Sequence, residues 1–153
     1  MRTQILDTNS KKLTMEVYMK NFLRTVLVVA LLSTASLAAA KDALFVNMTS
    51  NDAHRADMAT RLPLRMLKMG HPVTIFLNDK GIFLATKSAG PELENAQKNI
   101  NELVKNGAKV LVCPYCMEYY KVNAKDLVNG VEISEPKKID TALFTNNTQT
   151  LSW

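Results

Sequence analysis

The two cysteines of this chain are the residues best suited to chemistry, and they stand in the segment Cys113-Pro114-Tyr115-Cys116. They directly follow KVLV, an apolar run typical of a buried strand. Proline favours the first position of a helix, so we expect Cys113 to cap the next helix, where the helix dipole and free N–H groups favour a thiolate. Cys116 lies one helical turn further on, close enough to form a disulfide with Cys113 or to accept sulfur from it. The pattern indicates a reactive thiol pair with Cys113 as the nucleophile.

An inert structural disulfide is the alternative interpretation of the pair. Exported proteins often carry such a disulfide, and the N-terminal part of this chain predicts export, as described below. A bridge that closes so short a loop constrains the unfolded chain little and therefore stabilises the fold little. Metal binding fits the residues poorly. The pair supplies two ligands, His54 could add a third, and His71 begins a strand at the opposite edge of the sheet. We predict no metal and no other cofactor.

The dipeptide between the cysteines also matches that of glutaredoxins. A thioredoxin-like fold would need this motif near its first strand and a later cis-proline facing it. Here the motif follows the third predicted strand, and Pro136, the one later proline, stands in a charged segment that we predict to be a turn. We therefore exclude a thioredoxin fold. Tyr115, Tyr119 and Tyr120 either line a pocket beside the cysteines or pack a helix onto a sheet.

Alternating strand and helix patterns surround the cysteine pair. Strands are predicted at 43–48, 71–77, 109–112, 131–133 and 148–153. Helical segments are predicted at 53–69, 81–87, 91–106, 114–120, 124–128 and 139–144. Strands that alternate with helices imply βαβ units and a largely parallel sheet with helices on both faces. Ligands of such sheets bind beyond the carboxyl ends of the strands, which is where Cys113 stands.

The N-terminal part of the chain predicts export. Residues 19–40 carry a positive region with Lys20 and Arg24, an apolar region at 26–32 and small residues at 38–40, the pattern of a secretory signal peptide. The apolar run is too short for a typical transmembrane helix, although an uncleaved anchor is the alternative.

The remaining domain boundaries follow from this signal. Residues 1–18 are polar and without a period, so we interpret them as an over-extended start or a polar extension. Residues 41–153 are the predicted mature domain, periplasmic or secreted and free of the membrane after cleavage. The full chain of 153 residues has a net charge of +5, of which residues 1–40 contribute +3 (five basic minus two acidic). The small excess left on the mature domain does not indicate nucleic-acid binding.

The mature part resembles the DsrE/DsrF-like family of sulfur-relay proteins over nearly all of 42–153. The resemblance rests on the segments ALFVNMTS, MLKMGHPVTIFLNDKGIFLATK, ELVKNGAKVLVCPYCMEYY, NGVEI and TLSW. It implies a flavodoxin-like three-layer α/β sandwich, with about five mostly parallel strands, that assembles into trimers or hexamers. It also implies that Cys113 carries a persulfide and that Cys116 matches the second cysteine of a CxxC-bearing branch. Where the family often has Arg-Gly followed by a hydrophobic residue, this chain has Tyr120-Lys121-Val122.

Two functions are consistent with these patterns. The first is an exported sulfur- or thiol-handling protein of the sulfurtransferase-like carrier kind, which exchanges persulfides or disulfides with a sulfur donor, a sulfur acceptor or a thiol-redox protein. The second is a non-catalytic binding or assembly module in which Cys113 and Cys116 form a structural disulfide. We also expect a cyclic homo-oligomer with contacts near the Cys113 edge. A domain with one sheet to cover should leave some of its large apolar groups exposed in a lone subunit, and the candidates are the stretch 82–85, Met117, Tyr119 and Tyr120.

Overall fold

Five parallel strands form one sheet in the computed structural model, which describes residues 18–20 and 41–153. The strands lie in the order β4-β3-β2-β1-β5. Their bounds are β1 Leu44–Met48, β2 Val73–Leu77, β3 Lys109–Val112, β4 Glu132–Ile133 and β5 Gln149–Ser152. The predicted five-stranded parallel sheet is confirmed. The predictions for 1–18 and 19–40 lie outside the described residues, apart from the short helical segment 18–20.

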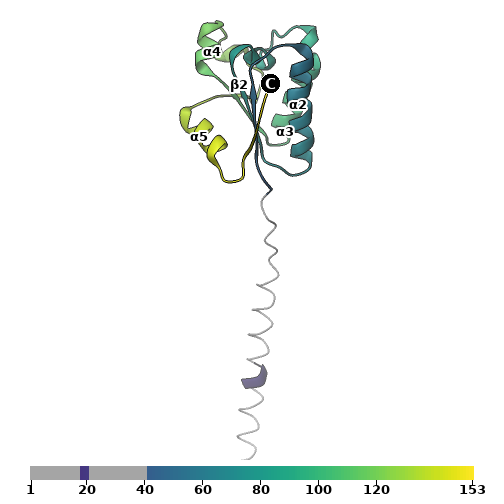
Figure 1. The fold of residues 1–153 in the computed structure, drawn as a ribbon, viewed down its shortest axis with the longest axis vertical. Helices are drawn as coiled ribbons and strands as arrows, with labels where there is room; N and C mark the ends of the chain where they lie inside the picture. The colour runs from purple at the N-terminus through teal and green to yellow at the C-terminus, as the bar shows by residue number, and fades with distance from the viewer. Residues whose placement is uncertain (1–17, 21–40) are drawn as a thin grey trace, which may run out of the picture. The chain divides into compact units, whose positions relative to one another are not determined.

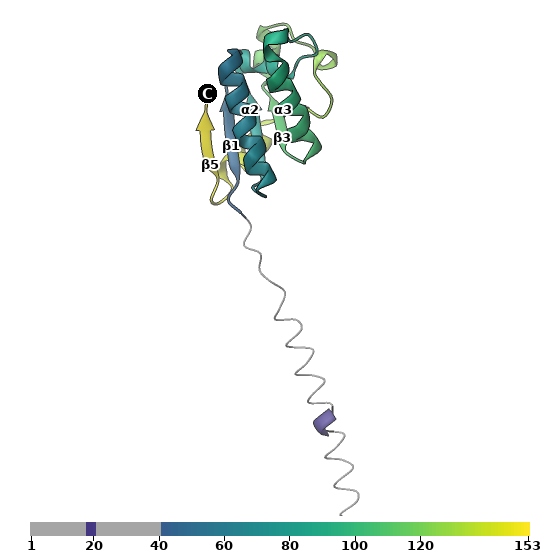
Figure 2. The same ribbon diagram turned by 90° about the vertical axis from the view of Figure 1, so that its right-hand side faces the viewer.

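Helices cover both faces of the sheet, as predicted. Two long helices, α2 (Ala53–Lys68) and α3 (Glu94–Lys105), lie side by side on one face (Figure 2). The shorter α5 (Pro136–Phe144) lies on the other face, and α4 (Pro114–Tyr119) follows β3 at the carboxyl end of the sheet (Figure 1). Short 3₁₀ helices complete the domain: η1 Asp79–Ala85, η2 Pro91–Leu93 and η3 Ala124–Asp126. Among the residues that the structure describes, no helix has the length and apolar character needed to cross a membrane.

The main core lies between the sheet and the pair α2 and α3. Val46, Ile75 and Val110 stand in register on three neighbouring strands, and each is at most 1% exposed. They pack into one cluster with buried helix residues such as Ala59 and Ile100. Side chains alternate between the faces of a strand, so this face takes every second residue of β1, β2 and β3. Each large side chain buried in this way stabilises the fold by about 1.5–3 kcal/mol.

The strand order places the crossovers. From β1 to β4 each strand is added on the same side of the previous one, and β5 then returns to the free side of β1. Connections between parallel strands are right-handed, so a change of direction moves the connecting helix to the other face. This explains why α5 lies opposite α2 and α3. At the reversal between β1 and β5, the Trp153 N–H donates to the Asn47 carbonyl (3.0 Å) and its carbonyl accepts from the Thr49 N–H (2.9 Å).

Three local expectations are corrected by the structure. The segment around Pro136 is not a turn, because Pro136 occupies the first position of α5, which begins three residues before the predicted 139. Lys138, within that helix, pairs with Glu132 at 2.7 Å. The predicted helix from Pro91 begins as the 3₁₀ turn η2 before α3 starts, and the helical segment predicted at 81–87 is the 3₁₀ helix η1.

Of the apolar groups named as candidates for exposure, the stretch 82–85 is not the part that is left exposed. Ile82, Leu84 and Ala85 are fully buried, because η1 folds back over the end of β2 and against α3. Met117 is likewise buried, with 6% of its surface exposed. Of the residues named for that argument, Tyr119 alone is strongly exposed, at 77%.

Candidate functional site: the cysteine pair

Cys113 ends strand β3 and caps helix α4, as the sequence predicted. Its backbone is extended, Pro114 follows in the first helical position, and its N–H donates to the Leu77 carbonyl of β2 (2.9 Å). Its Sγ accepts the Cys116 N–H at 3.4 Å. Cys113 is half-buried at the carboxyl edge of the sheet, where one backbone N–H contacts its sulfur and one backbone carbonyl holds its own N–H.

Cys116 is held by a residue from another part of the chain. Its Sγ accepts the N–H of Asp79 at 3.0 Å, a contact between residues 37 positions apart. Burial, and after it a hydrogen bond with the Cys113 side chain, raise the pKa of the Cys116 thiol to about 11, although the Asp79 N–H acts in the opposite direction. Cys116 therefore keeps its proton at neutral pH.

A tight turn after β2 positions Asp79. The turn is anchored to the end of β1, because the Asn78 N–H donates to the Met48 carbonyl (2.9 Å). Asp79 itself has a φ of 45°, a left-handed conformation that aspartate tolerates better than most residues. Gly81 lies so close to β1 that an added Cβ would stand 2.3 Å from the Met48 carbonyl oxygen. The turn thus needs glycine for close approach, and it aims the Asp79 amide at the cysteine.

Tyrosine side chains complete the site. The Tyr120 hydroxyl donates to the Asp79 carboxylate, and this hydrogen bond raises the pKa of Tyr120 to about 12. The Tyr120 ring lies edge-on to Phe83 and to Tyr119, with centroid distances of 5.2 and 4.8 Å. Beside them is an open hollow of about 380 Å³. It is lined by Asn78, Asp79, Tyr115, Cys116, Tyr119 and Tyr120.

The sequence interpretation left open whether the tyrosines line a pocket, and all three do. It missed Asp79 and Asn78, which come directly after β2. The signal was available, because the carboxyl ends of adjacent parallel strands meet at one edge of a sheet. The turn that follows β2 must therefore lie near the helix that follows β3.

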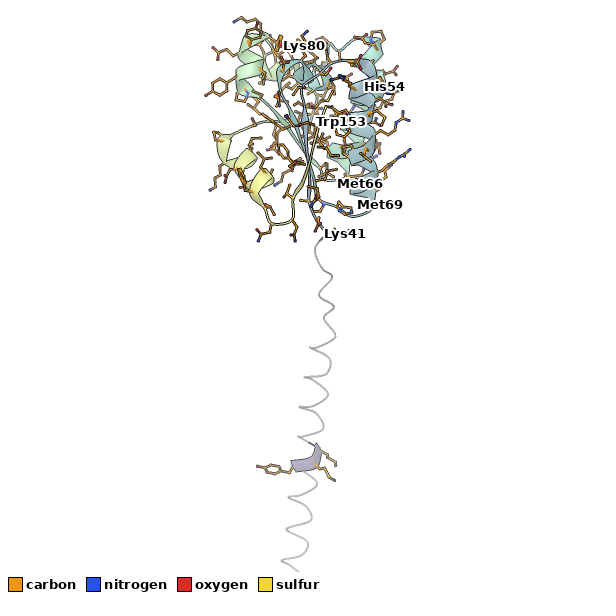
Figure 3. The ribbon with its side chains drawn as sticks, in the orientation of Figure 1. Lys41, His54, Met66, Met69, Lys80 and Trp153 are labelled. Atoms are coloured by element: carbon orange, nitrogen blue, oxygen red, sulfur yellow. The ribbon has the colours of Figure 1, made fainter. Side chains whose placement is uncertain are left out.

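The histidines do not join the cysteines. His71 lies at the amino end of the sheet, where its Nδ1 is 2.8 Å from the Asp42 carbonyl oxygen, and His54 stands in the first turn of α2 (Figure 3). Across 18–20 and 41–153, no three His, Cys, Asp or Glu residues are grouped so that they could hold a metal ion.

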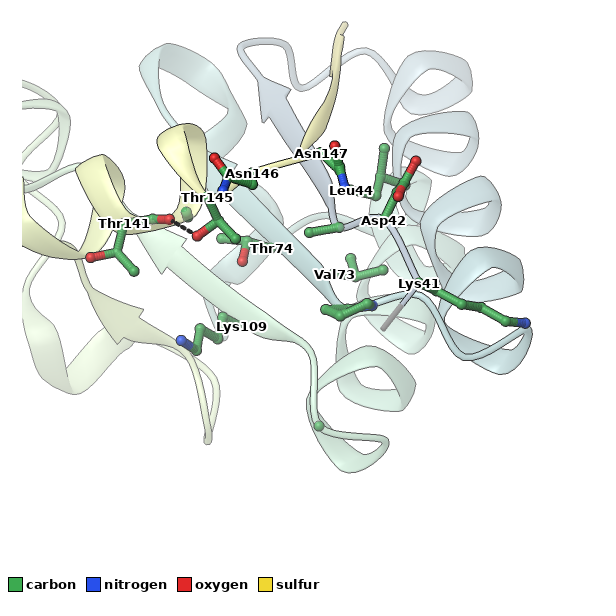
Figure 4. A pocket seen from close by; sticks show the side chains of 14 residues that line it. Lys41, Asp42, Leu44, Val73, Thr74, Lys109, Thr141, Thr145, Asn146 and Asn147 are labelled. Carbon is green, nitrogen blue, oxygen red and sulfur yellow. Dashed lines mark hydrogen bonds between the residues drawn. The ribbon is translucent and has the colours of Figure 1, made fainter. Parts of the chain in front are cut away.

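A second hollow lies at the opposite edge of the sheet. It measures about 350 Å³ and opens at the amino ends of β1, β2 and β3, bounded by α5 (Figure 4). Its side chains include Lys41, Lys109 and Thr145, and Thr145 donates from its hydroxyl to the Thr141 carbonyl (2.5 Å). This hollow contains no cysteine. The cysteine edge is therefore the better candidate for chemistry.

Three solved structures with the same fold illustrate the likeness. The ychN protein of E. coli aligns with a TM-score of 0.64 and 16% identity, over 74% of this chain and 100% of that one. Protein MTH1491 of Methanobacterium thermoautotrophicum aligns with a TM-score of 0.62 and 11% identity, over 74% of this chain and 100% of that one. Protein BT1422 of Bacteroides thetaiotaomicron aligns with a TM-score of 0.60 and 20% identity, over 77% of this chain and 100% of that one. At these identities the likeness shows the fold alone.

Sequence relatives agree with this fold. Uncharacterized protein MK0008 of Methanopyrus kandleri is 33% identical over 81 residues, which are 52% of this chain and 67% of the relative. Uncharacterized protein MJ0989 of Methanocaldococcus jannaschii is 32% identical over 81 residues, 52% of this chain and 71% of the relative. The DsrE/DsrF-like family model matches residues 41–147, a span that includes both cysteines. The chain therefore belongs to the DsrE/DsrF-like family, and this membership indicates, at a coarse level, a role in sulfur relay.

Proposed function

We propose that this protein is an exported sulfur- or thiol-exchange protein in which Cys113 is the nucleophile and Cys116 its partner. One observation carries the proposal. Both residues carry free thiols, and each sulfur accepts a backbone N–H: Cys113 from Cys116 at 3.4 Å, and Cys116 from Asp79 at 3.0 Å. Amide donors aimed at sulfur stabilise negative charge on it, which is what a nucleophilic or leaving thiolate requires.

The protonation of Cys116 supports the division of roles. Its pKa of about 11 keeps it a thiol at neutral pH, and part of this shift comes from its hydrogen bond with the Cys113 side chain. A thiol that keeps its proton is a poor nucleophile, because the thiolate is the attacking species. We therefore assign the first attack to Cys113 and the second step to Cys116.

The exchange proceeds in balanced steps. The Cys113 thiolate attacks the outer sulfur of a persulfide R–S–SH, the S–S bond breaks, RS⁻ leaves, and a Cys113 persulfide forms. An acceptor thiolate then removes the outer sulfur and restores Cys113. Alternatively Cys116, losing its proton, attacks the Cys113 Sγ. This releases hydrosulfide and leaves a Cys113–Cys116 disulfide, which an external dithiol must reduce.

Persulfide loading followed by mass spectrometry tests this proposal. The chain has 2 cysteines, so any sulfur gained maps to one of them. The reduced protein should gain the mass of one sulfur atom from a small-molecule persulfide. Cys113→Ser should gain none, whereas Cys116→Ser should gain it and release it more slowly, because no internal disulfide can form.

Two results would contradict the proposal. Loading of Cys113→Ser at the wild-type rate would show that Cys113 is not the nucleophile. A pair that never loads, and whose reduction potential lies below about −300 mV, would indicate a structural disulfide in a non-catalytic binding or assembly module.

Export and self-assembly belong to the same proposal. The signal-peptide pattern of 19–40 supports a periplasmic or secreted location for 41–153. Tyr115 and Tyr119, 82% and 77% exposed beside the cysteines, support an assembly of identical subunits, a trimer or hexamer, with contacts at this edge. Exposed aromatic side chains of this kind are enriched where proteins meet.

A further inference from the structure

The hollow beside Cys116 has a definite electrostatic character. Its lining combines one thiol, one amide, three phenols and one carboxylate, that of Asp79. Lys80 and Lys121 directly follow Asp79 and Tyr120 in the chain, but neither lines the hollow. The charged group that lines the hollow is therefore negative.

The Asp79 carboxylate is held in place rather than free to turn away. Its oxygen accepts the Tyr120 hydroxyl, and the Tyr120 ring is itself held against Phe83. The backbone of the same residue donates its N–H to the Cys116 Sγ at 3.0 Å. The carboxylate and the amide that binds the Cys116 sulfur thus belong to one anchored residue, and Asp79 and Cys116 line the same hollow.

We propose that Asp79 determines the specificity of the cysteine site, by selecting persulfides and disulfides that are neutral or positively charged beside the reacting sulfur. Anionic compounds, sulfur oxyanions such as thiosulfate among them, are disfavoured. This inference rests on the exchange function proposed above. Like charges a few ångströms apart at a protein surface change a rate by about five- to tenfold, and salt weakens the effect.

The reaction used to test this selection is a complete thiol–disulfide exchange. The Cys113 thiolate attacks one sulfur of R–S–S–R, the S–S bond breaks and RS⁻ leaves, which forms a mixed disulfide. The other cysteine loses its proton and attacks the protein-bound sulfur of that mixed disulfide, releasing the second thiol. The pair is oxidised to a Cys113–Cys116 disulfide by two electrons, and one small disulfide is reduced to two thiols.

The experiment compares three small disulfides of similar length and different charge: cystamine (cationic), bis(2-hydroxyethyl) disulfide (neutral) and dithiodipropionate (anionic). The reduced protein is mixed with each at neutral pH and low salt, quenched by alkylation and analysed by mass spectrometry. Asp79→Asn should lower the ratio of the cystamine rate to the dithiodipropionate rate by about three- to tenfold. High salt should lower the wild-type ratio toward that of the variant. The neutral disulfide is the internal reference for each variant.

Matched variants separate the carboxylate from other effects. Asparagine tolerates a positive φ well, so Asp79→Asn keeps the turn. Asp140→Asn removes the same charge from the exposed side of α5 and should leave the ratio unchanged. Tyr120→Phe keeps the Asp79 charge and should keep a ratio above that of Asp79→Asn.

Three outcomes are decisive. A ratio in Asp79→Asn equal to that of wild type would overturn the specificity role while leaving the exchange function standing. An equal shift in Asp140→Asn would also overturn it, because net charge and not the hollow would then be the cause. If no disulfide oxidises the wild-type pair, the proposed exchange function itself fails.

Discussion

Asp79 acts on Cys116 through two groups, and their effects oppose each other. Its amide N–H stabilises a Cys116 thiolate and lowers the pKa, whereas its carboxylate raises it. Burial is larger than either effect, so the pKa of Cys116 stands at about 11. The residue that holds the sulfur in place therefore also limits when it ionises, and the carboxylate can influence which compounds approach.

The raised pKa of Tyr120 predicts that the folded protein loses stability in alkaline solution. Its pKa is raised from 10.0 to about 12, first by its hydrogen bond to Asp79. Between these values the folded chain holds a proton that the unfolded chain has lost, so the free energy of unfolding falls as pH rises. Urea unfolding at several pH values from 9 to 12 should show a steeper fall for wild type than for Tyr120→Phe.

The same variant supplies the control. Cys116 titrates with the same sign from 9.0 to about 11, and it is present in both proteins, so its effect largely cancels in the difference. Equal slopes for wild type and Tyr120→Phe would show that the Asp79 hydrogen bond does not form in solution.

At the scale of elements, the site depends on the turn that opens η1. This turn contacts the end of β1 through Asn78, and its Asp79 amide contacts the Cys116 sulfur in α4. It therefore links two strand ends and one helix across three separate stretches of chain. Gly81 allows this close approach, because the carbonyl of Met48 leaves no space for a Cβ.

Gly81→Ala should therefore affect both stability and chemistry. The added Cβ would stand 2.3 Å from the Met48 oxygen, so the turn must shift, at an expected cost of about 1–3 kcal/mol. Gly107→Ala is the matched control: its φ is +88° and nothing lies within 4 Å, so it should lose about 1–2 kcal/mol from backbone strain alone. Urea unfolding measures both losses.

The cysteines distinguish the two variants. Gly81→Ala should change the alkylation rate of the pair, because the Asp79 amide moves with the turn, whereas Gly107→Ala should not. If Gly81→Ala leaves that rate unchanged, the turn does not hold the cysteine site in place.

At the scale of the whole domain, the two faces of the sheet are covered unequally. Two helices of 16 and 12 residues bury their apolar sides on one face. On the other face α5 has 9 residues, none of them buried, and Phe144 at its end is 77% exposed. Together with the exposed tyrosines beside the cysteines, this leaves apolar surface that a neighbouring copy of the chain can cover.

Light scattering of the protein recovered from a periplasmic fraction tests both assembly and export. We expect a mass three or six times that of a subunit consisting of residues 41–153. Tyr119→Glu, at the cysteine edge, should lower that mass. Met69→Glu should not, because Met69 is similarly exposed (60%) but follows α2 at the opposite end (Figure 3). A single-subunit mass that does not change with concentration would contradict the prediction.

Features that depend on neighbouring residues could be predicted from the amino-acid sequence. Strand β3 was predicted at its observed bounds, and Cys113 was predicted as the helix cap, because an apolar run and a proline in the first helical position are local signals. The parallel sheet followed from the alternation of such segments. Pro136 is the exception. The charged residues around it led to the prediction of a turn, whereas Pro136 occupies the first position of α5, as the preference of proline for the first helical turn favours.

Tertiary structure alone decided how distant segments meet. The contact between Asp79 and Cys116 joins residues 37 positions apart, and it exists because β2 and β3 lie side by side and end at the same edge. Ile82 is also buried by distant segments. It belongs to a core cluster whose other members come from elements that precede and follow it in the chain. Hydrogen bonding and apolar burial depend on which groups are close in space, and that proximity is a property of the folded chain rather than of any one segment.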